Sequence, residues 1–189
     1  MDIDLNKSLF TELTNQIQNQ ARQSLSTLVD RAHQIDHLLK KDLFVCRENL
    51  HSLSLSIHHH LSDFIELIEH LTIWLELEIP SYSESDDYRI SVQNEILDQI
   101  ASIKVNSIAS LGQFVDYHEQ RAMAKKELFK RSNFDDNEQL IDYLDEQFSR
   151  NLKLMLIELK SSILHICHLL SKNRPILLQR TSTHVNNYF

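Results

Sequence analysis

Glycine and proline are nearly absent from this chain, whose 189 residues include one glycine, Gly112, and two prolines, Pro80 and Pro175. Average usage would be roughly 7% glycine and 5% proline. Because tight turns depend on these residues, the sequence has no glycine-rich loop that could hold a phosphate or a dinucleotide. A β-sandwich or barrel, which needs a turn about every 8–12 residues, is excluded for the same reason. The sequence therefore predicts a few long helices.

Cysteine, clustered positive charge and long apolar runs are also scarce. Two cysteines, Cys46 and Cys167, cannot make a disulfide framework or a four-thiolate zinc site, which favours a reducing compartment. With 19 Lys+Arg against 27 Asp+Glu the net charge is −8, so nucleic acid is not an expected partner. The most apolar stretch, residues 152–170, contains three charged residues, and the N-terminus MDIDLNKSLF lacks the pattern of a secretory signal. We expect no membrane contact and a cytoplasmic or nuclear location.

Apolar residues recur every three or four positions through four long segments, which is the spacing of one helical face. The segments run from about residue 5 to 41, from 50 to Pro80, from about 90 to 130, and from about 138 to Pro175. The residues expected to face inward are Leu5, Leu9, Leu13, Ile17, Ala21, Leu25, Leu28, Ala32, Ile35 and Leu39; Leu50, Leu53, Ile57, Leu61, Phe64, Ile68, Leu71 and Leu75; Ile96, Ile100, Ile103, Ile108, Leu111 and Val115; and Leu140, Leu144, Phe148, Leu152, Met155, Leu159, Ile163, Ile166 and Leu170.

Four such helices predict one all-α domain over residues 1–189, an up-down four-helix bundle about 50 Å tall. Polar loops are expected at 81–89 and 132–137, and a polar tail at 179–189. In this topology the 81–89 loop and the tail leave the bundle at the same end, which suits docking onto a partner. The apolar stripes are wide, which favours a second buried face against another subunit.

Histidines at helical spacing are the first candidates for a metal site. Two pairs have a spacing compatible with a metal: His33 with His37, and His165 with His168. A di-iron bundle needs two Glu-x-x-His motifs and two further glutamates, and the chain has one such motif, Glu48–His51. The run His58–His60 points in three directions around a helix. We expect no metal or cofactor, and a ferritin-like metalloenzyme is disfavoured for want of ligands.

Catalytic groups are no better supported. Cys167 lies among apolar helix residues, where a buried, inert thiol is expected. The acidic pairs Asp86–Asp87, Asp135–Asp136 and Asp145–Glu146 fall in loops or on a helix surface, where solvated charge or helix capping is the ordinary role. The residues themselves therefore predict a protein that is not an enzyme.

A specific sequence pattern surrounds the 81–89 loop. Residues 71–80 read LTIWLELEIP, and the loop is followed by Ser91-Val92-Gln93. The 11S proteasome activator (REG) family has a Trp-Leu-x-Leu-x-Ile-Pro run, an activation loop of matching length and a similar continuation that ends in Gln. Further positions fall in register without a gap: Tyr117, Arg121, Leu144, Asp145, Glu146, Glu158, Lys172 and Asn173. The chain thus resembles the 11S proteasome activator family over nearly its whole length.

This resemblance implies a homoheptameric ring that caps the α-subunit ring of the proteasome core particle and stimulates peptide hydrolysis without ATP. It implies docking by a C-terminal tail that binds through its backbone and terminal carboxylate, and gate opening by the activation loop. The tail residues are Asn186, Asn187, Tyr188 and Phe189. The activation-loop residues are Ser83, Glu84, Ser85, Asp86, Asp87, Tyr88, Arg89 and Ile90. The alternative is a helical-bundle scaffold or adaptor that docks another protein.

The chain departs from the family pattern at four places. Asp87 occupies the position of the asparagine associated with gate opening, and a carboxylate lacks the amide donor. Arg89 replaces a glycine, from which we expect strain if the backbone there needs a positive φ. The Lys/Glu-rich insert between the first two helices is absent. Pro175 falls where the family helix continues, which predicts an earlier break and a longer tail.

Overall fold

Four α-helices make up almost all of the part of the chain that the structure, a computed structural model, describes. The described residues are 2–40, 49–79, 87–130 and 135–177, with side chains described throughout except at 2–10 and 135–137. In chain order the helices are α1 (Asp2–Lys40), α2 (Leu50–Leu77), α3 (Asp87–Lys130) and α4 (Asp135–Leu177). The predicted all-α class is confirmed.

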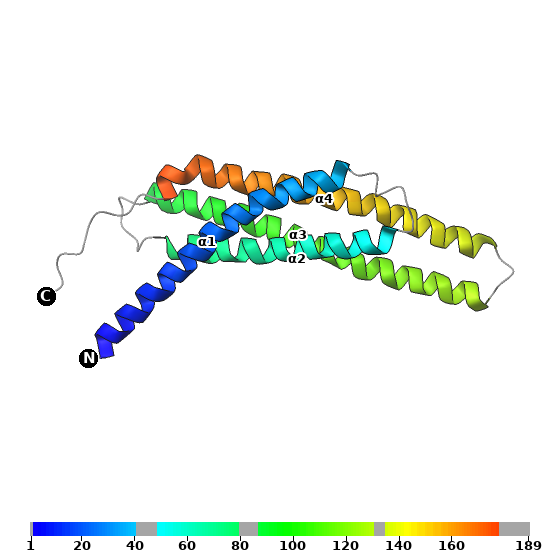
Figure 1. The fold of residues 1–189 in the computed structure, drawn as a ribbon, viewed down its shortest axis with the longest axis horizontal. Coiled ribbons are helices and arrows are strands. Elements are labelled where there is room, and N and C mark those ends of the chain that lie inside the picture. Colours follow the sequence, from blue (N-terminus) through cyan, green and yellow to red (C-terminus); the bar gives the residue numbers. More distant parts are fainter. Residues whose placement is uncertain (1, 41–48, 80–86, 131–134, 178–189) are drawn as a thin grey trace.

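The helices run alternately in opposite directions along one rod (Figure 1). Each packs against its neighbours in the sequence, α1 also packs against α4, and the diagonal contact between α2 and α4 is weaker. This is the up-down four-helix bundle that the sequence predicts. The helices contain 39, 28, 44 and 43 residues. α3 therefore spans about 66 Å at 1.5 Å per residue, which exceeds the predicted height.

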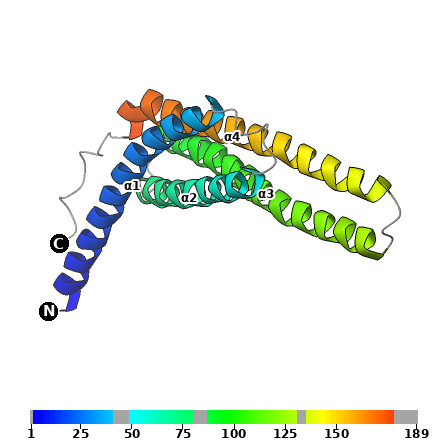
Figure 2. The ribbon, with the colours of Figure 1, turned by 45° about the vertical axis from the view of Figure 1, so that its right-hand side comes forward.

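The bundle has four helices only in its middle. At one end α3 and α4 continue past the start of α2 as a two-helix hairpin, and at the other the N-terminal part of α1 diverges from the remaining helices (Figures 1 and 2). Two residues predicted to face inward lie in these regions and are exposed, Leu13 by 56% and Leu140 by 45%. That prediction was wrong because no fourth helix covers them. The side chains of Leu5 and Leu9 lie outside the described ones.

The core is a continuous column of aliphatic side chains from all four helices. Burying one such side chain completely stabilises the fold by about 1.5–3 kcal/mol. Its largest fully buried members are Leu28 and Ile35 of α1; Ile57, Phe64, Ile68, Leu71 and Leu75 of α2; Ile96 and Ile100 of α3; and Leu152, Leu156 and Ile163 of α4.

The inward face of α3 differs from the predicted one beyond Ile103. Ile108 and Val115 are 49% and 58% exposed, whereas Ser107 and Ser110 are 7% exposed each. Burial of the two serines costs little because their hydroxyls donate to the carbonyls one turn earlier in the same helix, at 2.9 and 3.1 Å. α3 therefore carries an apolar stripe that faces away from the core of its own bundle.

Two helix boundaries also differ from prediction. α3 begins at Asp87 instead of near residue 90, and α4 begins at Asp135, inside the predicted 132–137 loop. Pro175 does not break α4, which continues to Leu177. Because Pro175 lies in the last turn, the hydrogen bond that it cannot donate and the clash of its ring with the carbonyl four residues earlier affect only the end of the helix, and the expected early break does not occur.

Among the described residues one segment, Glu138–Leu177, is long and apolar enough by length and composition alone to cross a membrane. The same segment supplies Phe148, Leu152, Leu156 and Ile163 to the bundle core, where each is at most 3% exposed. A core helix needs apolar residues for that packing. Only 33% of the most apolar part of this segment is buried in the bundle, and the exposed Leu154, Ile157 and Leu164 contribute the rest of its apolar character.

Candidate functional site

The predicted loop and the predicted tail start at the same end of the rod. α2 ends there at Leu77, α3 begins there at Asp87, and α4 ends there at Leu177 (Figure 1). Leu177 is 2% exposed and belongs to the core cluster. The point from which the tail leaves the bundle is therefore anchored by apolar packing. The tail residues themselves, Asn186, Asn187, Tyr188 and Phe189, lie outside the described residues.

Four of the eight predicted activation-loop residues belong to the first turn of α3, which is a correction to the predicted 81–89 loop. Asp87 and Tyr88 are exposed, Tyr88 by 73%, and Ile90 is half-buried. Asp87 places a carboxylate at the positive N-terminal end of the helix, which stabilises that end by about 0.3–1 kcal/mol. The other four residues, Ser83, Glu84, Ser85 and Asp86, lie outside the described part of the chain.

Arg89 is buried, with 8% of its surface exposed. Its Nη2 donates to the backbone carbonyl oxygen of Glu78 at 3.3 Å. The strain expected from placing arginine at a glycine position is absent, because Arg89 lies in an α-helix, where φ is negative and any L-residue except proline is tolerated. The departure from the family pattern at this position adds a contact between α2 and α3.

Glu78 is the C-terminal cap of α2. Its amide closes the last turn by donating to the carbonyls of Trp74 and Leu75 at 3.1 and 3.2 Å. Its own carbonyl lies past the helix end, where carbonyl groups have no partner within the helix. Besides Arg89, the Nε2 of the fully buried Gln93 donates to this oxygen at 3.2 Å. The Glu78 carboxylate accepts from Gln18 Nε2 of α1 at 2.9 Å, so three helices meet at this one residue.

Two exposed apolar stripes lie away from that end. Recurrence at three- and four-residue spacing is typical of a helix face that packs against another helix. The members are Val105, Ile108, Gly112 and Val115 on α3, and Leu154, Ile157 and Leu164 on α4. A Cβ added to Gly112 would meet nothing within 4 Å, so the protomer itself does not require a glycine there.

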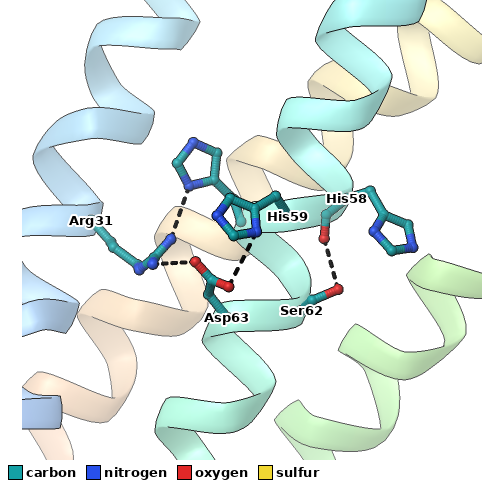
Figure 3. A network of polar contacts seen from close by, with 6 residues as sticks. Arg31, His58, His59, Ser62 and Asp63 are labelled. Carbon is teal, nitrogen blue, oxygen red and sulfur yellow. Dashed lines mark hydrogen bonds and ion pairs between the residues drawn. The ribbon is translucent and has the colours of Figure 1, made fainter.

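The three consecutive histidines of α2 point in different directions, as predicted. The rings of His58 and of Phe114 in α3 lie nearly perpendicular to each other, with centroids 5.3 Å apart. On the α1 side, His59 Nδ1 lies 3.3 Å from an oxygen of Asp63, whose other oxygen accepts from Arg31 of α1 (Figure 3). Arg31 Nη1 is also 3.2 Å from Nδ1 of His60. Burial and the Arg31 charge lower the pKa of His60, so the ring favours its neutral form.

Among the described residues, side chains that could bind a metal or act as nucleophiles do not come together in one site. No group of three or more His, Cys, Asp or Glu side chains among these residues is placed to hold an ion. Cys167 is half-buried in α4 and burial raises the pKa of its thiol, which keeps it protonated and unreactive. Cys46 and Glu48, considered in the sequence, lie outside the described residues.

The contacts of Arg89 and Gln93 with Glu78 were not predicted from the sequence. A signal for them exists, since the inward positions Ile100 and Ile96 continue at spacings of three and four to Gln93 and Arg89. Polar residues on an otherwise buried stripe need buried partners. Which group is the partner cannot be predicted from the sequence, because it is a main-chain carbonyl at the end of another helix.

Comparison with known proteins gives a consistent result. A family model described as proteasome activator PA28, C-terminal, matches residues 43–184. Proteasome activator complex subunit 3 of Homo sapiens and that of Mus musculus are each 22% identical over 109 residues, 58% of this chain and 43% of the relative. The 11S subunit of the Plasmodium falciparum proteasome, PA28, aligns with a TM-score of 0.83 over 93% of this chain and 94% of that chain, at 17% identity.

The three comparisons align different shares of this chain and of the matched proteins. The aligned region spans less than half the length of the curated relatives. The likeness to the solved structure, at 17% identity, concerns the fold, and it extends over nearly the whole of both chains. The family model covers residues from before α2 to beyond the end of α4, including both stems of the predicted activation loop.

Proposed function

The chain belongs to the family of the proteasome activator PA28, and we propose that it is an ATP-independent activator of the proteasome core particle. The observation that carries the proposal is the gathering of three chain segments at one end of the rod. The stems of the predicted loop, at Glu78 and Asp87, and the anchored start of the tail, at Leu177, lie together there (Figure 1). One end can therefore present both a docking segment and a gate-opening segment to a single partner.

In this proposal the tail residues Asn186–Phe189 dock into the α-subunit ring of the core particle. Binding of an extended segment through its backbone tolerates side-chain variation. The residues Ser83–Ile90 then contact the gate, with Tyr88 and Asp87 as exposed members on the first turn of α3. The protein carries out no chemical step of its own; it admits peptides to a peptidase, in the cytoplasm or the nucleus.

In this proposal the protomers assemble into a closed ring, a homoheptamer by the family pattern, and the two exposed stripes support such an assembly. A stripe on α3 and another on α4 form two different surfaces of one protomer, and contact between unlike surfaces of identical subunits builds rings when the rotation closes. Several tails on one ring bind together, which raises the overall affinity without any new contact.

Ring assembly is tested by placing a charge on the α3 stripe. Ile108→Glu buries a carboxylate in the proposed interface, and the native mass should shift from an oligomer toward the protomer. Asn106→Glu, at an exposed position on another face of α3, is the matched control and should assemble normally. A wild-type protein that is monomeric at micromolar concentration, or an Ile108→Glu protein that assembles like the control, would refute this interface.

Docking and gate opening are separated by two further variants. Deletion of Asn186–Phe189 should abolish both binding to the core particle and stimulation of peptide hydrolysis. Asp87→Tyr should leave binding intact and remove stimulation, because it changes the gate-facing turn and leaves the tail unchanged. Binding to the core particle that survives the deletion would contradict the role of the tail, and would favour docking through another surface of the bundle.

A further inference from the structure

The two donors that converge on the Glu78 carbonyl close the base of the activation loop. Arg89 and Glu78 are 11 positions apart in the chain, and their hydrogen bond joins the end of α2 to the first turn of α3. Gln93, one turn further along α3, donates to the same oxygen at 3.2 Å. We call the set of Glu78, Arg89 and Gln93 the loop clamp.

The position of Arg89 is electrostatically unfavourable within its own helix. A cation in the first turn of a helix faces the positive end of the helix dipole. The same side chain reaches the C-terminal end of α2, where unpaired carbonyls make the local potential negative. The negative potential at the end of α2 thus offsets the unfavourable interaction of the arginine with the dipole of α3. This indicates that the contact with α2 determines where the Arg89 side chain lies.

The Arg89 and Gln93 side chains of the loop clamp are buried, so its hydrogen bonds are shielded from water. Arg89 is 8% exposed and Gln93 is 0% exposed. A hydrogen bond from a charged donor is stronger than a neutral one, and exclusion of water strengthens it further. The Glu78 side chain is tied in addition to Gln18 of α1, so the residue at the end of α2 is held from two sides.

Helix ends are the parts of a bundle that fray most easily. If the last turn of α2 and the first turn of α3 opened, the segment between them would gain several mobile residues on each side. A longer loop samples more conformations, so it spends less time in contact with any one position on the gate. The clamp prevents this opening at the two positions from which the loop begins and ends.

From this geometry we propose that Arg89 and Gln93 are positioning residues for gate opening. They fix the base of the activation loop through the Glu78 carbonyl, so that Ser83–Tyr88 meet the gate in one place. Arg89 belongs to the predicted activation loop, but its buried side chain acts on Glu78 and not on the core particle. This inference rests on the proposed function, and it predicts that loop placement can be lost while docking is retained.

The test uses Arg89→Met and Gln93→Met, which keep a long side chain and remove the donors. Gln93→Met is expected to fold, because it removes the buried Oε1, which has no hydrogen-bond partner among the described residues, and because the Glu78 carbonyl keeps the Arg89 donor. Arg89→Lys restores one charged donor. Arg150→Met, an exposed arginine of α4 that pairs only with the helix neighbour Glu146 in the contacts described, is the matched control.

Two quantities are measured for each assembled variant with the core particle and a fluorogenic peptide: the concentration that gives half-maximal effect, and the maximal stimulation. A charged hydrogen bond is worth about a factor of ten in an equilibrium constant. Maximal stimulation by Arg89→Met should therefore fall several-fold, up to about tenfold, with the half-maximal concentration unchanged. Arg89→Lys should recover part of the loss, and Arg150→Met should match the wild type.

A second measurement examines the clamp without the core particle. Amide hydrogen exchange of the free protein should be faster in Arg89→Met across residues 76–79 and 87–93, and unchanged in the core of α2. If the wild type stimulates and the two methionine variants stimulate equally, or lose only docking affinity, the inference is wrong and the proposed function stands. If the wild type binds and stimulates nothing, the proposed function fails and the inference fails with it.

Discussion

The buried carboxylate of Asp145 gives the sharpest test of how α3 and α4 are held together. Its side chain is 5% exposed and accepts from Arg121 Nε at 2.6 Å, from Arg121 Nη2 at 3.1 Å and from the Tyr117 hydroxyl at 2.8 Å. The Tyr117 ring also stacks on Phe148 of α4, with centroids 3.8 Å apart. Asp145 raises the pKa of Arg121, which is the expected direction for a cation that gains an anionic partner.

The cost of removing this carboxylate can be worked from the geometry. Breaking a buried ion pair by deleting one partner costs about 3–5 kcal/mol, because the other charge is left without compensation. Arg121 is 29% exposed and regains water, so we expect Asp145→Ala to lower the free energy of unfolding by about 2–3 kcal/mol. Tyr117→Phe removes one neutral donor and should cost about 1 kcal/mol. Asp145→Asn keeps the shape, loses the charge and should fall between them.

Urea unfolding at fixed protein concentration, with the assembly state verified for each variant, measures these differences at equal m-values. Glu146→Ala is the control, since this neighbouring carboxylate is 68% exposed and pairs with Arg150 on the surface. It should change stability by at most about 0.5 kcal/mol. An Asp145→Ala protein within that same range, or one more stable than the wild type, would refute the reasoning.

Two predictions concern pH. The pKa of Asp36 is lowered from 3.8 to about 2 by hydrogen bonds from Lys160 and Lys40, so its contribution to stability is complete above about pH 3.8 and is lost as pH falls toward 2. In the Asp36→Asn protein the urea midpoint should depend less on pH within that window. A pH profile equal to that of the wild type would contradict this prediction. Burial and Arg31 lower the pKa of His60 below 6.5 despite the nearby Asp63 carboxylate. As pH falls, His60 is therefore protonated in the unfolded chain before it is protonated in the folded one. Stability should fall as pH drops below about 6.5. His60→Gln should flatten that fall, and an equal slope in both proteins would show that His60 is not responsible.

The fold could be predicted from the sequence because helix periodicity and the lack of turn-forming residues agree along the chain. The prediction failed where more than one face of a helix is apolar. On α3 the sequence offers Ile108 and Val115 as inward residues, yet Ser107 and Ser110 take the inward positions. A serine that bonds back to its own helix is compatible with burial. Periodicity alone cannot tell a face that packs in the protomer from one left for a neighbour.

The candidate site was predicted less completely, for a different reason. The polar composition of residues 81–89 predicts a loop, but Asp87 and Arg89 are helical. The first turns of α3 are joined to the end of α2 through Arg89 and Gln93, a tertiary interaction that local propensity does not contain. The helical backbone at Arg89, with its negative φ, explains why arginine replaces the expected glycine without strain.

Stimulation of the latent proteasome core particle is the most direct test of the proposed function. Hydrolysis of a fluorogenic peptide is measured without ATP, with increasing amounts of the wild-type protein and of the protein lacking Asn186–Phe189. The proposed function predicts a several-fold, saturable increase with the wild type and none with the truncated protein. No increase at concentrations where the wild type is bound to the core particle, or an equal increase with the truncated protein, would contradict it.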